Sequence, residues 1–327
     1  MHVLIAIHHR VQAWTIQPAH VEALRRRFPH TTFLHATTRE ADIDLARTAD
    51  VAFALALPKE AVANAARLKW VHCSGHAVGH FPLSELAARA ITVTNSRGVQ
   101  AIPIAEHVMA CILALARRLP QTMRDQQERL WRPNDLIGTV SPWLLSGRTL
   151  AVIGVGTIGE ALAARAKAFG IRVVGVRRHP ERGRPAGFDE VLGPVDMGRL
   201  LGLADIVVVA APLTAETNLL LDADAITKLK PGAIVVNIAR GQLVDEDALA
   251  AALLKGRLGG AALDVFTTEP LPANSPFWSL PNVIVTPHNS GFRAGHFDAV
   301  IELFSDNLTR FERGDQLLNV VDLDAGY

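Results

Sequence analysis

Three polar residues, Arg240, Glu269 and His288, each lie just past an apolar run of the sequence that reads as a strand. A guanidinium can hold a carboxylate through two hydrogen bonds, an imidazole can give and take a proton near neutral pH, and a carboxylate can stabilise the protonated imidazole. Each residue alone has a structural alternative, because Arg240 can pair with Asp245, Glu269 can be an exposed turn residue and His288 a satisfied core histidine. Together the three types predict acid–base catalysis on a substrate that carries a carboxylate.

A glycine-rich segment, Gly154-x-Gly156-x-x-Gly159, ends another apolar run and leads at once into a helical pattern. Gly154 permits the tight turn, Gly156 lets the backbone approach a pyrophosphate, and Gly159 lets the helix pack close to the strand. The N-terminus of that helix attracts phosphates. We expect the helix to face the sheet through four apolar residues, Ile158, Leu162, Ala166 and Phe169. A turn that merely needs glycine is the alternative, but the strand–turn–helix context favours dinucleotide binding.

Basic residues follow the next expected strand, at Arg177-Arg178-His179, with Arg182 and Arg184 close behind. An acidic residue at this position, roughly 20 residues beyond the glycines, would hold the ribose 2′-hydroxyl of NAD. Guanidinium groups instead suit a dianionic 2′-phosphate, which a carboxylate would repel. A solvated basic loop is the alternative. Arg177 and Arg178 therefore predict a preference for NADP(H) over NAD(H).

The composition is that of an ordinary globular protein. With 327 residues, the chain is long enough for two domains, and a formal net charge of +1 gives no global reason to expect nucleic acid or a membrane surface as a partner. Two cysteines, Cys73 and Cys111, make no disulfide framework and fit a reducing cytosol. The N-terminal segment lacks the features of a signal peptide, and we expect a cytoplasmic protein.

Short apolar runs alternate with helical patterns along the whole chain, which indicates a parallel α/β architecture. A first series of expected strands covers 3–7, 32–35, 51–54, 70–73 and 91–94. A second series covers 150–153, 172–176, 206–209, 233–237, 260–263 and 283–285. A long helix is expected over 103–118, then an irregular stretch, and a last helix over 299–312. The sequence therefore predicts two doubly wound parallel-sheet domains.

Four motifs, in chain order, resemble those of the D-isomer-specific 2-hydroxyacid dehydrogenases. They are the glycine motif already described, Val236-Asn-Ile-Ala-Arg-Gly241, Ala262-Leu-Asp-Val-Phe-x-x-Glu-Pro270 and Thr286-Pro-His-x-Ser-Gly291. The resemblance covers nearly the whole chain, and Ile104-Ala-Glu-His-Val108 looks like the long linking helix of that family. Within the family, the chain looks most similar to the branch of glyoxylate/hydroxypyruvate reductases and broader 2-keto acid reductases, which often use NADPH.

The resemblance implies a Rossmann-type cofactor domain and a flavodoxin-like substrate domain with a cleft between them. Residues 1–98, completed by the C-terminal segment 291–327, would form the substrate domain. Residues 99–290 would form the dinucleotide domain and include the linking helix. That helix and the stretch from Trp131 to Trp143 are the usual contacts of a homodimer in this family.

The implied reaction is the reduction of a 2-keto acid to the D-2-hydroxy acid. Arg240 would bind the carboxylate and polarise the carbonyl, His288 would donate a proton as hydride arrives from the nicotinamide, and Glu269 would pair with His288 and favour its protonated form. Besides the glycines and arginines, the implied cofactor contacts are Thr157 and Ile158 at the pyrophosphate, Pro212 and Thr217 beside the ribose, and Ile238, Ala239 and Asp264 along the nicotinamide half.

One loop departs from the family pattern. Relatives commonly read Ala-Gly-Val-Asp where this chain has His76-Ala-Val-Gly79. Backbone donors survive such changes, so we expect His76 and Ala77 to bind the substrate together with Arg240 and His288. The same loop gives His72, His76 and His80 a spacing of four residues, but the glycines between them disfavour a helix, and we predict no metal site.

Two alternatives stay open. The 3-phosphoglycerate dehydrogenases carry similar motifs, and phosphate recognition would require basic residues near the substrate. The corepressors of transcription that resemble this family can retain the same Arg, Glu and His, so a non-catalytic dinucleotide sensor is the alternative from a different class. We expect a small 2-keto or 2-hydroxy acid as the partner, and neither nucleic acid nor membrane.

Overall fold

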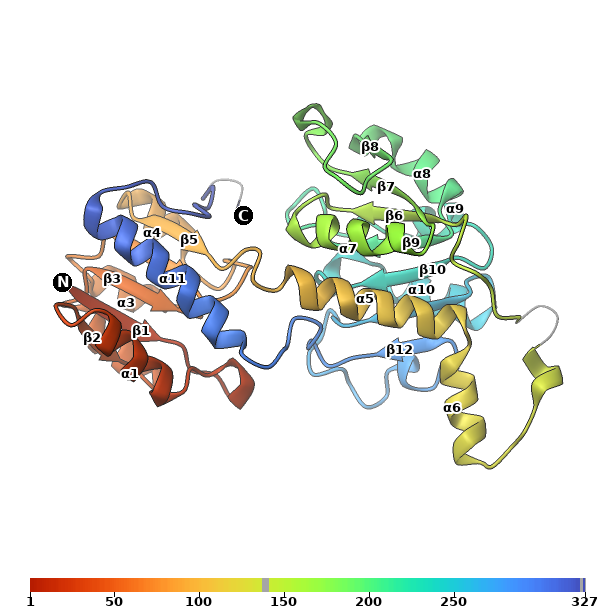
Figure 1. Cartoon of the computed structure of the whole chain (residues 1–327), viewed down its shortest axis with the longest axis horizontal. Helices are drawn as coiled ribbons and strands as arrows, with labels where there is room; N and C mark the ends of the chain where they lie inside the picture. The colour runs from red at the N-terminus through yellow and green to blue at the C-terminus, as the bar shows by residue number, and fades with distance from the viewer. Residues whose placement is uncertain (137–140, 324–325, 327) are drawn as a thin grey trace. The chain divides into compact units, whose positions relative to one another are not determined.

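The structure of the chain is a computed structural model that describes residues 1–136, 141–323 and 326. Its contacts divide the chain into two compact units, residues 1–99 with 293–327 and residues 100–292. Each unit is built on one parallel sheet, of five strands in the first and seven in the second (Figure 1). The predicted class, α/β with two parallel sheets, is therefore confirmed. The assignment of substrate to the first unit and dinucleotide to the second stays a prediction.

The first unit has the strand order β2-β1-β3-β4-β5. Its strands are β1 (His2–Ala6), β2 (Thr32–His35), β3 (Val51–Ala54), β4 (Trp70–Cys73) and β5 (Thr92–Asn95). Its helices are η1 (Gln12–Trp14), α1 (Pro18–Arg27), α2 (Arg39–Ala46), α3 (Lys59–Asn64), α4 (Leu83–Ala88) and α11 (His296–Arg313). All five strands were predicted within one residue of these bounds, because each is a short apolar run with turn residues on both sides.

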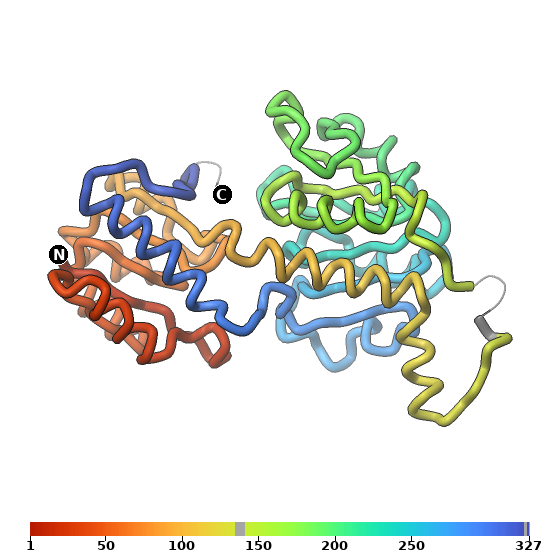
Figure 2. Tube along the Cα trace, in the orientation of Figure 1, coloured from red at the N-terminus to blue at the C-terminus, as the bar shows by residue number. Residues whose placement is uncertain are grey.

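The C-terminal helix α11 belongs to this first unit. Figure 2 shows the blue C-terminal part of the chain running beside the red and orange N-terminal strands. The ring of Phe304 stacks on Phe53 with centroids 4.1 Å apart and lies 5.5 Å from Trp70. Val320 forms an antiparallel bridge with Thr94. One face of the sheet is thus covered by residues that are more than 200 positions away in sequence.

The second unit has the strand order β12-β11-β10-β9-β6-β7-β8. Its strands are β6 (Thr149–Ile153), β7 (Arg172–Val176), β8 (Glu190–Leu192), β9 (Ile206–Val209), β10 (Ile234–Asn237), β11 (Gly260–Leu263) and β12 (Val283–Val285). The chain runs outward from β6 through β7 to β8, then returns to β9 on the other side of β6. Ligands of open parallel sheets bind at the carboxyl ends of strands next to such a reversal.

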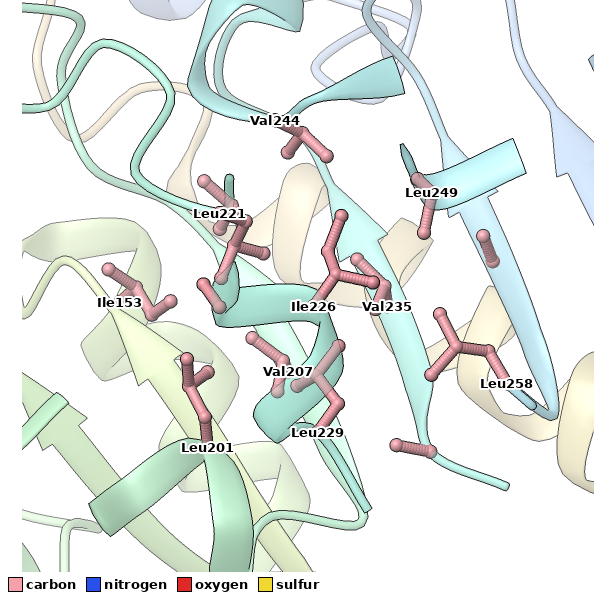
Figure 3. Packing of buried hydrophobic residues seen from close by; sticks show 14 of the residues in the cluster. Ile153, Leu201, Val207, Leu221, Ile226, Leu229, Val235, Val244, Leu249 and Leu258 are labelled. Carbon is pink, nitrogen blue, oxygen red and sulfur yellow. The ribbon is translucent and has the colours of Figure 1, made fainter. Parts of the chain in front are cut away.

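Helices cover both faces of this sheet. Helices α5 (Ala101–Ala116) and α7 (Thr157–Ala168) pack on one face, and α8 (Met197–Leu203), α9 (Ala223–Lys228) and α10 (Glu246–Leu254) on the other. Figure 3 shows the second face, where Leu201, Ile226 and Leu249 of these helices point at Val207 and Val235 of the strands. The short helices of this unit are η2 (Pro133–Leu136), η3 (Pro180–Arg182), η4 (Pro194–Asp196), η5 (Gly241–Leu243) and η6 (Pro276–Trp278).

Three details differ from the sequence prediction. The stretch expected to be irregular contains helix α6 (Leu119–Gln127), which buries none of its side chains and projects from the second unit in Figure 1. Strand β8 was missed, because its three residues, Glu190-Val-Leu192, begin with a charged residue and do not form an apolar run. Phe169, expected on the buried face of α7, lies beyond the end of that helix and is 41% exposed.

Within the described part of the chain, none of the helices combines the length and apolar character that crossing a bilayer requires.

Candidate functional site

The three polar residues singled out in the sequence follow three neighbouring strands. Arg240 comes after β10, Glu269 after β11 and His288 after β12, and these strands pair in parallel in that order. Because the carboxyl ends of parallel strands meet at one edge of the sheet, the three residues leave the sheet on the same side. The second unit therefore brings together a cation, a carboxylate and an imidazole without any residue from the first.

Glu269 and His288 are in direct contact. His288 Nδ1 lies 2.8 Å from Glu269 Oε2, and the other carboxylate oxygen, Oε1, accepts a hydrogen bond from the backbone N–H of Phe266 at 3.0 Å. An ionised carboxylate only accepts, so the pairing places a proton on Nδ1 and fixes the orientation of the ring. The two side chains are 42% and 36% exposed, so the pair stays accessible from solvent.

The backbone of His288 has an unusual conformation that Asp264 stabilises. The φ angle of His288 is 52°, in the left-handed region that non-glycine residues seldom adopt. Its N–H donates to the backbone oxygen of Asp264 at 2.8 Å. The buried carboxylate of Asp264 accepts hydrogen bonds from Asn289 N at 2.9 Å, Ser290 N at 3.0 Å and the Thr286 hydroxyl at 2.6 Å. Asp264 thus holds the loop that presents the imidazole.

Arg240 is positioned by a buried asparagine at the end of β10. Asn237 Nδ2 donates to the backbone oxygen of Arg240 at 2.8 Å, and its Oδ1 accepts from Ala239 N at 3.1 Å. A side chain at Gly241 would place its Cβ 2.0 Å from the backbone carbon of Phe266, so this turn packs directly against the segment that leads to Glu269.

The guanidinium of Arg240 is partly withdrawn from water. Nη1 donates to Ala239 O at 2.6 Å. Burial lowers the pKa of this group from its usual value, and the charge of Glu269 opposes the shift. An arginine still keeps its charge under such a shift, and partial burial strengthens its attraction for an anion. Asp245, the alternative partner considered from the sequence, instead caps α10 by accepting from Ala248 N at 2.9 Å.

The glycine motif forms the expected strand–turn–helix between β6 and α7. Gly154 has φ 111°, and a Cβ there would lie 2.5 Å from Ala210 O, so the turn touches the end of β9. A Cβ on Gly159 would lie 2.7 Å from Gly154 O, whereas one on Gly156 meets no atom within 4 Å. Two glycines are therefore required by packing, whereas the middle one faces open space, which leaves its backbone accessible to a ligand.

Two buried donors in this region suit an anionic ligand. The hydroxyl of Thr157, the first residue of α7, and Nε of Arg177, just after β7, are buried and have no hydrogen-bond partner among the described residues. Buried polar groups are almost always paired, so such groups indicate a ligand or water that would complete them. Ile158 follows in the first turn and is half-buried. The residues present therefore fit the pyrophosphate of a dinucleotide at the start of α7.

The predicted ribose and nicotinamide contacts lie along the same edge of the sheet. Pro212 and Thr217 share one loop after β9, in which the Thr217 hydroxyl donates to Pro212 O at 2.7 Å. Ile238 and Ala239 follow β10, Ile238 being buried and Ala239 half-buried. The roles of these residues, and of Asp264 toward a cofactor, stay predictions. Thr286 and Asn237 were not predicted, although both are polar residues at the ends of apolar strands.

The remaining predicted site residues, His76 and Ala77, lie in the first unit after β4. The backbone oxygen of His76 accepts from Asn95 Nδ2 at 2.7 Å, and that of Ala77 accepts from Cys73 Sγ at 3.4 Å. Their role toward a substrate stays a prediction. In residues 1–136, 141–323 and 326, no three His, Cys, Asp or Glu side chains gather in a way that could hold a metal ion. The long helix lies in the second unit, while 137–140 of the predicted dimer stretch fall outside the described residues.

Comparison with known proteins places the chain in a family. The NAD binding domain of the D-isomer specific 2-hydroxyacid dehydrogenases matches residues 109–290, more than half of the chain. A glyoxylate reductase of Korarchaeum cryptofilum is 35% identical over 255 residues, which are 76% of this chain and 74% of that protein. The chain therefore belongs to the D-isomer specific 2-hydroxyacid dehydrogenase family, as its motifs had indicated.

Two further relatives widen the picture. A D-3-phosphoglycerate dehydrogenase of Mycobacterium leprae is 35% identical over 298 residues, which are 91% of this chain and 54% of that protein. The chain thus spans about half the length of the mycobacterial dehydrogenases that it matches. A D-isomer specific 2-hydroxyacid dehydrogenase from Xanthobacter autotrophicus Py2, solved in complex with NADPH and MES, is 30% identical, with a TM-score of 0.82 and 99% of both chains covered.

Proposed function

We propose that this protein reduces a small 2-keto acid, of the glyoxylate or hydroxypyruvate kind or broader, to the D-2-hydroxy acid with NADPH. The observation that carries the proposal is the His288–Glu269 contact at 2.8 Å, on the same sheet edge as the partly buried Arg240. A proton donor oriented by a carboxylate, beside a fixed cation, is what the reduction of a carboxylate-bearing carbonyl requires. Family membership supports this reaction class.

Arg240, Glu269 and His288 each have a separate role in the proposed reduction. The guanidinium of Arg240 holds the substrate carboxylate through two hydrogen bonds and draws electron density from the adjacent carbonyl. Glu269 keeps Nδ1 of His288 protonated, so that Nε2 presents the second proton of the imidazolium to the carbonyl oxygen. When bound, the reduced nicotinamide supplies the hydride that the carbonyl carbon receives. The transferred proton completes the hydroxyl, and His288 is left neutral.

The preference for NADP(H) rests on the residues after β7. Arg177, Arg178 and His179 stand where an acid would select NAD, and Arg178 is exposed at the carboxyl edge of the sheet. The Xanthobacter relative, at 30% identity, was solved with NADPH. Both observations support NADP(H) as the preferred cofactor.

We further propose that the protein is a homodimer that uses α5, α6 and the segment after α6. Met123 is 62% exposed and Trp131 is 94% exposed, an arrangement typical of a surface that a partner covers. A groove of about 870 Å³ beside α6, lined by Leu254, Trp143 and Arg124 among others, offers such residues of a second copy a place to bind. Light scattering with Trp131→Ala beside the wild type checks the mass in solution.

The function is tested by following NADPH or NADH oxidation at about 340 nm with purified protein and a panel of 2-keto acids. The panel contains glyoxylate, hydroxypyruvate, pyruvate, 2-oxobutyrate, phenylpyruvate and 3-phosphohydroxypyruvate. We expect faster oxidation of NADPH than of NADH, with glyoxylate or hydroxypyruvate among the best substrates. Turnover of 3-phosphohydroxypyruvate alone would favour the phosphoglycerate dehydrogenase alternative, which the mycobacterial relative supports. Tight cofactor binding without turnover of any acid would favour the dinucleotide sensor.

A further inference from the structure

One ion pair links two loops on either side of the glycine turn. Arg178, after β7, points its Nη2 at Oε2 of Glu216, in the loop after β9, at 3.1 Å. Strand β6 lies between those two strands and pairs with both. Neighbouring strands are about 4.8 Å apart, so β7 and β9 are roughly 10 Å apart, and the two side chains bridge that distance across the carboxyl end of β6. The glycine turn begins at that end of β6, so the ion pair lies at the edge of the sheet where the dinucleotide is proposed to bind.

The carboxylate of Glu216 is held in place by its own loop. The Thr214 hydroxyl donates to Glu216 Oε2 at 2.8 Å. Thr214 N donates to the Thr217 hydroxyl at 2.8 Å, and that hydroxyl donates to Pro212 O at 2.7 Å. The hydrogen bond from Thr214 lowers the pKa of Glu216 most, followed by its backbone hydrogen bond and the charge of Arg178. The residue is therefore an anion at neutral pH, presented to Arg178 by an ordered turn.

Arg177 differs from Arg178 in the partner of its guanidinium. Its Nη2 donates to the backbone oxygen of Gly183, within the loop that follows β7. Arg178 is the cation that faces the loop after β9. A ligand phosphate at this edge would thus find Arg178 engaged by a carboxylate of the protein.

We propose that Glu216 is a specificity-determining residue for the 2′-phosphate of the cofactor. It occupies the guanidinium of Arg178 until a ligand phosphate takes its place, and so moderates the preference for a 2′-phosphorylated nucleotide over its unphosphorylated counterpart. This inference rests on the proposed NADP(H) preference. An unphosphorylated ribose leaves the ion pair intact, whereas a 2′-phosphate must displace one anion with another.

The test is calorimetric titration of the full chain with adenosine 2′,5′-bisphosphate and with adenosine 5′-monophosphate, which differ only in the 2′-phosphate. Exposed ion pairs contribute little, so we expect Glu216→Gln to tighten bisphosphate binding by about two- to fivefold and to leave monophosphate binding unchanged. Arg178→Gln should weaken bisphosphate binding, and Glu216→Gln should have no effect in that background. Glu302→Gln is the matched control, because Glu302 is an exposed acid of the first unit that pairs with an arginine, Arg27, at 2.8 Å.

The outcomes separate this inference from the proposed function. If the wild type prefers the bisphosphate and Arg178→Gln abolishes that preference, but Glu216→Gln leaves it unchanged, the role of Glu216 is refuted and the NADP(H) preference stands. Weaker bisphosphate binding by Glu216→Gln also refutes the inference, since it would make Glu216 a ligand rather than a competitor. Equal binding of both nucleotides by the wild type refutes the NADP(H) preference and the inference together.

Discussion

Two histidines at the ends of parallel strands, one in each unit, have opposite environments. His72, in β4, is fully buried; Nδ1 lies 2.7 Å from the Thr94 hydroxyl and Nε2 lies 3.2 Å from that of Ser96. His288, after β12, is 42% exposed and has a carboxylate at Nδ1. Burial lowers the pKa of His72 to about 3. A position near the end of a strand therefore does not by itself make a histidine reactive. A histidine that can act in catalysis also needs access to solvent and a charged partner, and His288 has both.

The largest expected effect is at the exposed histidine, His288. His288→Asn removes the proposed proton donor, and we expect kcat to fall by about 10² to 10⁴-fold. The melting temperature should change little, because the loop is held by Asp264 through backbone groups rather than through the imidazole. Steady-state kinetics and calorimetry of the two proteins measure both quantities. A variant that retains more than a tenth of wild-type kcat would show that another group donates the proton.

A smaller effect is expected at the cation beside the pair. Arg240→Lys keeps the charge but loses the two parallel hydrogen bonds to a carboxylate, so the KM for the 2-keto acid should rise roughly tenfold. Arg199→Lys is the control, since Arg199 is an exposed arginine of the same unit that pairs with Glu190 at 3.3 Å. Initial rates against substrate concentration give the KM of each variant. An equal KM in wild type and Arg240→Lys would argue against carboxylate binding by Arg240.

At the buried histidine we expect no effect on catalysis and a change in stability alone. His72→Leu removes the group that pairs with the Thr94 hydroxyl, and we expect the free energy of unfolding at pH 7 to fall by about 1 to 3 kcal/mol. Urea denaturation measures that loss. The kcat should stay unchanged. A fall in kcat without a loss of stability would show that His72 acts in catalysis rather than in the core alone.

The same variant makes the pH dependence of stability testable. The pKa of His72 is about 3 in the folded protein against 6.5 as its usual value, so between these values only the unfolded chain binds the proton. The contribution of neutral His72 to the free energy of unfolding is thus complete above about pH 6.5, and it falls by about 1.4 kcal/mol for each pH unit below that value. Between pH 7 and pH 5, the stability of the wild type should therefore fall by about 2 kcal/mol relative to His72→Leu.

Much of the fold could be predicted because the strands are short apolar runs between turns. The strand that was missed, β8, has the sequence Glu190-Val-Leu192, which is not an apolar run, whereas β12 is equally short and half-exposed but was predicted from Val283-Ile-Val285. Helix α6 buries no side chain, and apart from Leu119, Pro120 and Met123 its residues are polar, so its sequence does not predict a helix that faces the core. Phe169 continues the apolar spacing of α7, but the helix ends before it, at Ala168.

The reactive residues of the candidate site could be predicted from the sequence, but most of the contacts that position them could not. Arg240, Glu269 and His288 are polar residues after apolar strands, and a linear pattern shows this directly. The contacts of Asp264 with the loop around His288 join residues 22 to 26 positions apart, and no local pattern encodes them. The pair of Arg178 and Glu216 likewise depends on the order of strands in the sheet, which places β6 between their loops.

The division of the first unit into two segments has a consequence for synthesis on the ribosome. Its five strands are made first, but α11, whose Phe304 covers Phe53 and Trp70, follows only after the whole of residues 100–292. At 5–20 residues per second, the aromatic face of the early sheet waits roughly 10 to 40 s for its cover. The second unit is continuous and can fold meanwhile. The nascent chain therefore completes its units in the reverse of the order in which it begins them, and the N-terminal sheet stays uncovered longest during synthesis.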